Sequence, residues 1–220
     1  MKRTLLISFL LFQFSVFAQN NSKWSIGIEY SADDLSISDN RGGISYIITD
    51  GNINGYIIDF NKNNYSFGLT ARYLIKKKLS ISSGILYSNK DFTGTYNCAT
   101  CGFYDPFPET IEQKFLVIPI SINYMLLTGK LRPIINGGIK NNLNIINDLK
   151  EQSKNYFLET FIGASVYYEF SKNWMVEIGY NFQIALTDLY KTDEFNLKTN
   201  NFLLQINYTF KTLDNKITPH

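Results

Sequence analysis

Strict two-residue alternation of apolar and polar side chains is the feature that most limits how this chain can fold. In the stretch NWMVEIGYNFQIAL, residues 173–186, every even position from Trp174 to Leu186 is large and apolar, whereas odd positions include Glu177 and Gln183. Successive side chains of a β-strand point to opposite faces. The pattern therefore predicts a strand with one apolar face and one polar face.

The same alternation recurs along the chain and predicts eight strands, with the phase least clear in the fifth. We expect them at residues 24–30, 65–74, 79–87, 115–126, 131–143, 156–170, 173–186 and 201–210. Three connections are short (IKKK, LTGK and SKN) and alternate with long connections rich in Asn, Asp, Gly and Thr. An antiparallel meander places alternate connections at opposite ends, so all short turns share one end. Bacterial outer-membrane barrels have this asymmetry, with short periplasmic turns and longer external loops.

The composition of the two faces predicts which one looks inward. The polar face carries small residues and few charges, whereas a soluble barrel would show many Lys and Glu side chains to water. Six glycines fall on this face: Gly27, Gly68, Gly84, Gly138, Gly163 and Gly179. The interior of an eight-stranded barrel is narrow, and Trp and Tyr at both ends of the apolar face are typical of membrane interfaces. We expect an all-β fold, an eight-stranded antiparallel up-and-down transmembrane β-barrel with its apolar face toward lipid.

The N-terminus predicts export. A basic start, Lys2 and Arg3, precedes an apolar run and the small residue Ala18, as in a secretory signal peptide. The predicted domains are a signal peptide over 1–18, an outer-membrane barrel over 19–210 and a polar tail over 211–220. Cleavage would leave 19 basic and 19 acidic residues, and this balance argues against nucleic-acid binding.

Several short motifs resemble a known family. They are the signal ending FAQ, the strand KFLVIPISINYML, the following LRPIINGGIKNNL and the closing NYTF. On these residues the chain resembles the small outer-membrane β-barrels called PorT-like or "porin family". The resemblance implies an integral outer-membrane protein of a Gram-negative envelope and implies no single activity. One departure is that KTLDNKITPH follows Phe210, so the chain does not end on the aromatic residue of its last strand.

The two cysteines form CATC in the long connection between the third and fourth strands. A tight turn brings Cys98 and Cys101 within disulfide range, and exported proteins meet oxidising conditions. We expect a local disulfide. A thioredoxin-type redox site needs a helix after the first Cys, and the following GFYDPFP does not open a helix well. Zinc needs two more ligands, and the chain's single His is His220; haem attachment needs a His where Gly102 stands.

Charged residues on the polar strand faces predict an internal network of ion pairs. Its expected members are Glu29, Arg72, Arg132, Lys140, Glu159, Glu169 and Glu177. Buried charges persist only when they are paired and hydrogen-bonded, so a network that plugs the barrel is the main interpretation. A gated pore or proton path is the alternative.

The loops suggest the function. The acidic segment 31–43 is predicted to be a solvated loop, and residues 44–60 to form a hairpin with an edge that binds partners. No catalytic residue, cofactor or metal site is expected. The Ser–His chemistry of barrel lipid A deacylases and palmitoyltransferases needs a His that no strand or loop contains, and a carboxylate-only or Ser–Lys site is left open, although no residue marks one. We expect a monomer that contacts outer-membrane lipid and, through its loops, envelope proteins. The alternatives are a narrow channel or part of an envelope transport machine, and a soluble lipocalin-like binding barrel.

Overall fold

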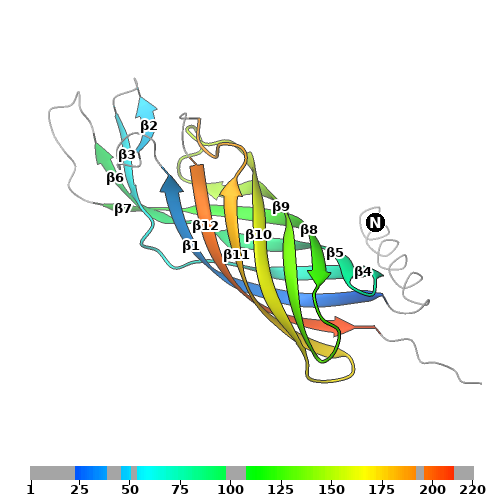
Figure 1. Ribbon diagram of the computed structural model, residues 1–220. Coiled ribbons are helices and arrows are strands. Elements are labelled where there is room, and N and C mark those ends of the chain that lie inside the picture. Colours follow the sequence, from blue (N-terminus) through cyan, green and yellow to red (C-terminus); the bar gives the residue numbers. More distant parts are fainter. Residues whose placement is uncertain (1–22, 39–45, 51–53, 98–107, 192–195, 211–220) are drawn as a thin grey trace, which may run out of the picture.

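A computed structural model describes residues 23–38, 46–50, 54–97, 108–191 and 196–210. Within these ranges the chain forms twelve β-strands (Figure 1). Their bounds are β1 Trp24–Ser38, β2 Tyr46–Asp50, β3 Asn54–Asp59, β4 Asn64–Lys76, β5 Leu79–Asn89, β6 Phe92–Asn97, β7 Glu109–Ile111, β8 Gln113–Met125, β9 Leu131–Asn147, β10 Tyr156–Glu169, β11 Trp174–Ala185 and β12 Asn196–Thr209. The described residues include no helix long and apolar enough to cross a membrane.

Eight of the strands close into a barrel in the order β1-β12-β11-β10-β9-β8-β5-β4. Every neighbouring pair is antiparallel, and β4 pairs with β1 to complete the ring. Short turns join β4 to β5, β8 to β9 and β10 to β11, and we call this the short-turn end. The long connections lie at the other end, the long-loop end. The predicted eight-stranded up-and-down barrel is confirmed.

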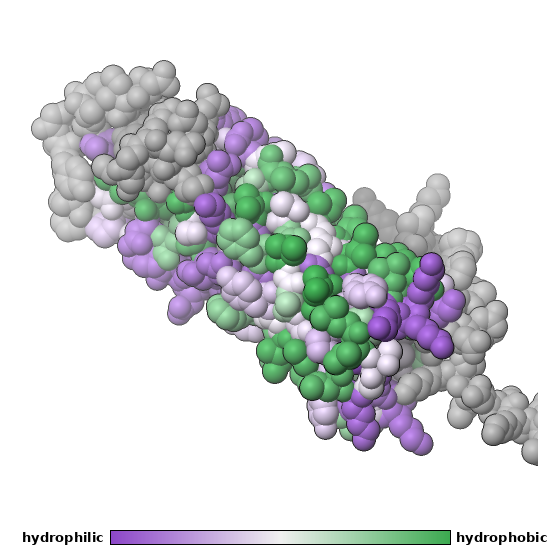
Figure 2. All heavy atoms as spheres, viewed as in Figure 1, coloured by the Kyte–Doolittle hydropathy of each residue, from purple (hydrophilic) through white to green (hydrophobic). Residues whose placement is uncertain are grey.

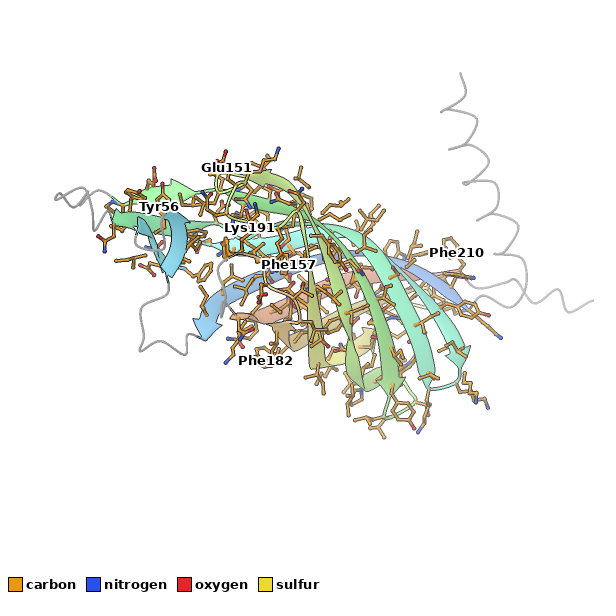
Figure 3. All side chains as sticks on the ribbon, turned by 90° about the horizontal axis from the view of Figure 1, so that it is seen from above. Tyr56, Glu151, Phe157, Phe182, Lys191 and Phe210 are labelled. Carbon is orange, nitrogen blue, oxygen red and sulfur yellow. The ribbon has the colours of Figure 1, made fainter. Side chains whose placement is uncertain are left out.

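The remaining four strands form a separate antiparallel sheet at the long-loop end, in the order β2-β3-β6-β7 (Figure 1). β2 and β3 are the hairpin predicted within residues 44–60. We call β2-β3-β6-β7 the loop sheet. Seen from above, Tyr56 of the loop sheet and Phe210 after β12 lie at opposite ends of the molecule (Figure 3).

The prediction of a solvated loop at 31–43 is wrong over its described part. Residues 31–38 continue β1, where Asp33 pairs in register with Asn201 on one side and Asn64 on the other. β9 likewise runs beyond its predicted end at 143 to Asn147. Both strands therefore extend the barrel wall past the apolar belt at its long-loop end.

The faces of the barrel strands point as the alternation predicts. Ile178 is 64 % exposed on the outer face, whereas its neighbour Glu177 is 1 % exposed inside. In β9, where the phase was unclear, Ile135 faces outward and Asn136 and Lys140 are buried inside. Hydrophobic residues gather over the barrel wall on the face shown in Figure 2. The outer surface is therefore a continuous apolar belt of the kind that lipid covers.

Aromatic side chains border this belt at both ends, as Trp and Tyr do at membrane interfaces. Their rings pack in pairs across neighbouring strands, with centroids about 5 Å apart. The pairs are Trp24 with Tyr73 and Trp174 with Tyr208 at the short-turn end, and Phe67 with Tyr87 and Tyr180 with Phe202 toward the long-loop end.

Glycine is required where the interior is crowded. A Cβ built on Gly163 would lie 2.0 Å from Oδ1 of Asn181, 2.4 Å from the Tyr180 carbonyl oxygen and 2.8 Å from Oδ1 of Asn136. Any larger residue would have to displace strand backbone and two buried amides. The glycine therefore permits the close packing that fills a narrow barrel.

Candidate functional site

The barrel interior holds two ion pairs between residues that the sequence singled out. Arg72 Nη2 lies 2.9 Å from Glu177 Oε2, and Ser165 donates to the other oxygen of the same carboxylate at 2.5 Å. Arg132 pairs with Glu169 near the short-turn end. Of the three partners considered for Glu177 from the sequence, the structure pairs it with Arg72.

Glu159 pairs instead with a residue that the sequence analysis missed. Lys90, in the connection after β5, places its Nζ 3.1 Å from Oε1 of Glu159, and Asn142 donates to Oε2 at 2.9 Å. The side chains of Lys90 and Glu159 are 3 % and 1 % exposed, so water hardly reaches this pair. The alternation of β5 could have predicted this. Leu86 and Ser88 face inward, and Lys90, two residues after Ser88, continues the same inward-facing series.

Glu29 and Lys140 line an interior cavity of about 50 Å³ together with Arg72 and Glu177. Among the described residues, the structure records no direct ion pair for either Glu29 or Lys140. The structure therefore places both residues beside Arg72 and Glu177 inside the barrel, without a direct ion pair of their own.

Asp33 is a buried anion that was not predicted from the sequence. Its carboxylate accepts hydrogen bonds from Ser31 at 3.0 Å, Ser66 at 2.5 Å and Asn201 at 2.6 Å. Three donors from three strands can stabilise a buried carboxylate without a cation. Alternation could have predicted this residue as well, because Glu29, Ser31 and Asp33 are alternate residues of β1 that point to the same inner face.

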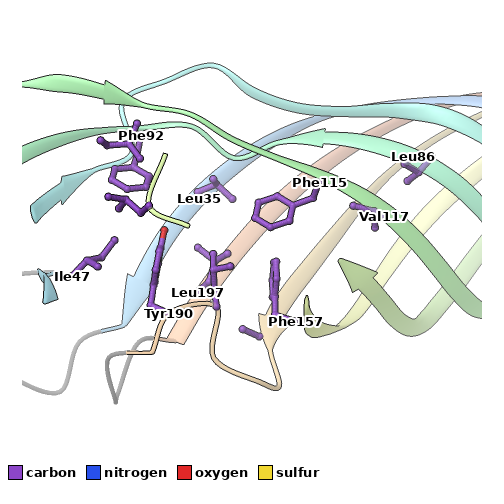
Figure 4. Packing of buried hydrophobic residues seen from close by; sticks show 13 residues of the cluster. Leu35, Ile47, Leu86, Phe92, Phe115, Val117, Phe157, Tyr190 and Leu197 are labelled. Atoms are coloured by element: carbon purple, nitrogen blue, oxygen red, sulfur yellow. The ribbon is translucent and has the colours of Figure 1, made fainter. Parts of the chain in front are cut away.

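An apolar cluster fills the long-loop end of the barrel (Figure 4). Phe115 of β8 and Phe157 of β10 meet edge to face with ring centroids 5.3 Å apart. Ile47 and Phe92 of the loop sheet belong to the same cluster. The remaining buried members come from the barrel strands, β7 and the loops: Leu35, Leu86, Ile111, Val117, Leu149, Ala185, Leu189, Tyr190 and Leu197. The loops therefore do not merely surround this end but close it with a packed core.

Tyr190 is the polar exception within the apolar cluster. Its hydroxyl donates to Oε1 of Gln113 at 2.9 Å, and Gln113 donates in turn to Asn147 at 3.2 Å. Burial raises the pKa of Tyr190 well above its ordinary value, although the hydrogen bond to Gln113 opposes this. The phenol is therefore neutral and anchors the connection after β11 onto β8.

The short-turn end contains an open depression of about 160 Å³. Basic and aromatic side chains dominate its lining: Lys23, Trp24, Arg72, Arg132, Tyr167 and Lys172. The two ends thus differ in chemistry, with an apolar seal at the long-loop end and a charged depression at the other.

The described residues contain no group of three His, Cys, Asp or Glu side chains placed to hold a metal ion. The predicted disulfide residues, Cys98 and Cys101, lie outside the described residues. The expected polar tail, 211–220, and the expected signal peptide, 1–18, also lie outside them.

Comparison with known proteins fits this architecture. The family model described as the outer membrane protein beta-barrel domain matches residues 4–210. The chain belongs to this family. The predicted resemblance to small outer-membrane barrels is thereby confirmed, and the chain is an outer-membrane β-barrel protein whose apolar belt contacts lipid.

Solved structures of outer-membrane barrels share the fold. Neisserial surface protein A is 12% identical, covers 86% of this chain and 99% of its own, and superposes with a TM-score of 0.55. AlkL, solved by solid-state NMR in DMPC bilayers, is 12% identical over 88% of this chain and 92% of its own, with a TM-score of 0.50. At these identities the likeness concerns the fold alone. The chain matches no curated protein by sequence.

Proposed function

We propose that this outer-membrane barrel is a non-enzymatic interaction protein that presents its loop sheet to partner proteins outside the cell. The observation that carries the proposal is the apolar cluster, because it joins the loop sheet to the barrel mouth through Ile47 and Phe92. Loops that only connect strands do not need to share an apolar core with the barrel. A loop sheet that presents an ordered binding surface does need such a core to hold it in place.

The two faces of the loop sheet differ in the way a docking surface requires. Tyr56 and Ile58 pack against the apolar cluster. The alternate positions face away from it, and there Asp59 pairs with Thr93 and Thr93 with Thr110. Asn61 accepts a hydrogen bond from the Thr93 hydroxyl at 2.6 Å. This outer face offers hydroxyl, amide and carboxylate groups on a rigid backbone.

The edge of the loop sheet adds a second recognition element. β2 pairs with β3 on one side, and no other described strand pairs with it. An unpaired strand edge can accept an extended peptide by β-strand addition. The interaction edge proposed from the hairpin at 44–60 therefore becomes β2.

The proposed orientation follows from the two kinds of connection. Outer-membrane barrels have short periplasmic turns and longer external loops. We therefore take the long-loop end as external. The start of β1 and the end of β12 lie at the short-turn end and are then periplasmic. A signal peptide cleaved after Ala18 would deliver the chain, and N-terminal sequencing of the mature protein should begin at Gln19.

Site-specific photocrosslinking in intact cells tests the platform. A photoreactive residue at Thr95, on the outer face of the loop sheet, should give a discrete adduct. Thr95 is half-buried, and the control is the same photoreactive residue at Lys150, which is exposed at the long-loop end and lies outside the loop sheet. Equal adducts at both positions, or none at Thr95, would contradict a specific role for the loop sheet.

A narrow channel is the second candidate, and the interior cavity of about 50 Å³ is the observation that favours it. Planar-bilayer recordings separate the two candidates. We expect no steady conductance, because the apolar cluster and the Lys90–Glu159 pair block the path. Steady single-channel conductance from wild-type protein would favour the channel.

A further inference from the structure

The depression at the short-turn end is distinct from the loop sheet and carries an excess of positive charge. Lys23, Arg72, Arg132 and Lys172 line it, whereas Glu169 is the one acidic residue among the lining residues that the structure describes. Glu177 neutralises Arg72 and Glu169 neutralises Arg132. Lys23 and Lys172 remain as exposed cations at the rim, so the field in the depression favours an anion.

Arg72 is held in a fixed orientation at the inner wall of this depression. Its guanidinium carbon lies 4.4 Å from the centroid of the Tyr167 ring, and its Nη2 bonds to Glu177. The Tyr167 hydroxyl is itself fixed by a hydrogen bond that Asn207 donates at 3.3 Å. A guanidinium fixed on two sides loses little conformational entropy when it binds a ligand.

Two residues that line the depression each have one buried polar atom without a hydrogen-bond partner among the described residues. These atoms are Nε of Arg72 and Oγ1 of Thr209. The side chain of Arg72 is 11 % exposed. A buried donor with no partner is costly, so a ligand that accepts from these two groups after a small shift of their side chains would remove an existing penalty.

The other walls are apolar. Trp24, Leu74, Met125 and Met175 contribute to the lining. At about 160 Å³, the depression is comparable to an engineered cavity that holds one benzene molecule, so a small group fits within it. An anionic head beside a short apolar body fits this combination.

We propose that the short-turn depression binds a carboxylate-bearing ligand, with Arg72 and Thr209 as the carboxylate donors and Trp24 against its apolar body. Arg presents its N–H groups in a fork that matches a carboxylate. A peptide C-terminus and a small organic acid share this chemistry, and both are compatible with the volume.

The test uses the fluorescence of Trp24 in the full mature chain, folded in detergent so that both ends are accessible. The chain has two tryptophans, so Trp174→Phe isolates the signal. The probe is N-acetylalanine, and its matched control is N-acetylalaninamide, which has the same shape and no charge. We expect saturable binding of the acid and at least about tenfold weaker binding of the amide, since a hydrogen bond to a charged group contributes a decade or more.

Three variants and one control variant assign the binding to this depression. Arg72→Gln combined with Glu177→Gln removes both charges while conserving volume, so it should fold and lose binding by about tenfold or more. Glu177→Gln alone frees Arg72 from its counter-ion and should tighten binding. Thr209→Val should weaken it. The control is Lys191→Gln. Lys191 is exposed at the long-loop end, so this variant should leave binding unchanged.

The outcomes are distinguishable. Equal binding of acid and amide, equal or tighter binding of inorganic phosphate, or full binding by the double variant would overturn the proposal. Tighter binding of N-acetyl-trialanine than of N-acetylalanine would support it with a peptide C-terminus as the source, and equal binding would support it with a small acid. None of these results depends on the loop sheet.

Discussion

Replacing Lys90 by Met tests whether the barrel is sealed. Lys90 Nζ lies 3.1 Å and 3.4 Å from the two carboxylate oxygens of Glu159. Met has similar length and no charge, so the substitution removes the cation and keeps most of the packing. Glu159 would then be a buried carboxylate with Asn142 as its remaining side-chain donor.

The magnitude follows from the burial of both partners. Because the side chains are 3 % and 1 % exposed, solvent cannot screen the charge that is left. Removing one partner of a buried pair costs about 3–5 kcal/mol. Lys90→Met combined with Glu159→Gln leaves no charge, so we expect this variant to cost clearly less than Lys90→Met alone.

Reversible urea unfolding in lipid vesicles measures these differences. The matched control is Lys154→Met, because Lys154 also pairs with a carboxylate, that of Asp188 at 3.4 Å, but both side chains are 45 % exposed. An exposed pair contributes about 0–1 kcal/mol. If Lys90→Met costs no more than Lys154→Met, water reaches Glu159, the seal is absent and the channel candidate gains support.

The remaining predictions concern Ile178, Tyr190 and the two cysteines. Ile178→Arg should destabilise the barrel by about 2–4 kcal/mol in the same assay, because it places a charge in lipid; a neutral effect would mean that the faces are reversed. Tyr190→Phe should cost about 1–3 kcal/mol by leaving the Gln113 oxygen without its donor. Burial raises the pKa of Tyr190 in the folded protein, so above about pH 10 this tyrosine ionises first in the unfolded state. The free energy of unfolding of wild-type protein should therefore fall above this pH, and that of Tyr190→Phe should fall less. Cys98 and Cys101 should resist alkylation until reduced, and two thiols that alkylate freely without reductant would contradict the disulfide.

Alternation predicted the barrel because the apolar and polar residues of each strand show which of its faces meets lipid and which meets the interior. Trp174, Ile178 and Glu177 separate into lipid-facing and interior residues without reference to any other strand. The same local rule, continued two residues at a time, would have reached Asp33 and Lys90. Both were missed because the polar segments that contain them look like loops, although their backbones continue the wall of the barrel.

Pairing across the barrel was beyond local reasoning. The sequence offered three basic residues as partners for Glu177, of which Arg72 is the partner. It did not identify Lys90, the partner of Glu159. Strand register and barrel curvature decide which inward side chains meet, and these depend on all eight strands at once. The apolar cluster was missed for the same reason, since Phe115 and Phe157 come from β8 and β10, which are not adjacent in the barrel.

The sequence by itself determined the fold class, the number of barrel strands and the face of each strand that meets lipid, because alternation and turn length are local and repeat eight times. Only the tertiary structure decided that residues 46–50, 54–59, 92–97 and 109–111 join into one loop sheet, that its core seals the long-loop end and that Lys90 reaches Glu159. Those features arise from contacts between segments far apart in the chain, and no single segment carries the information that specifies its distant partner.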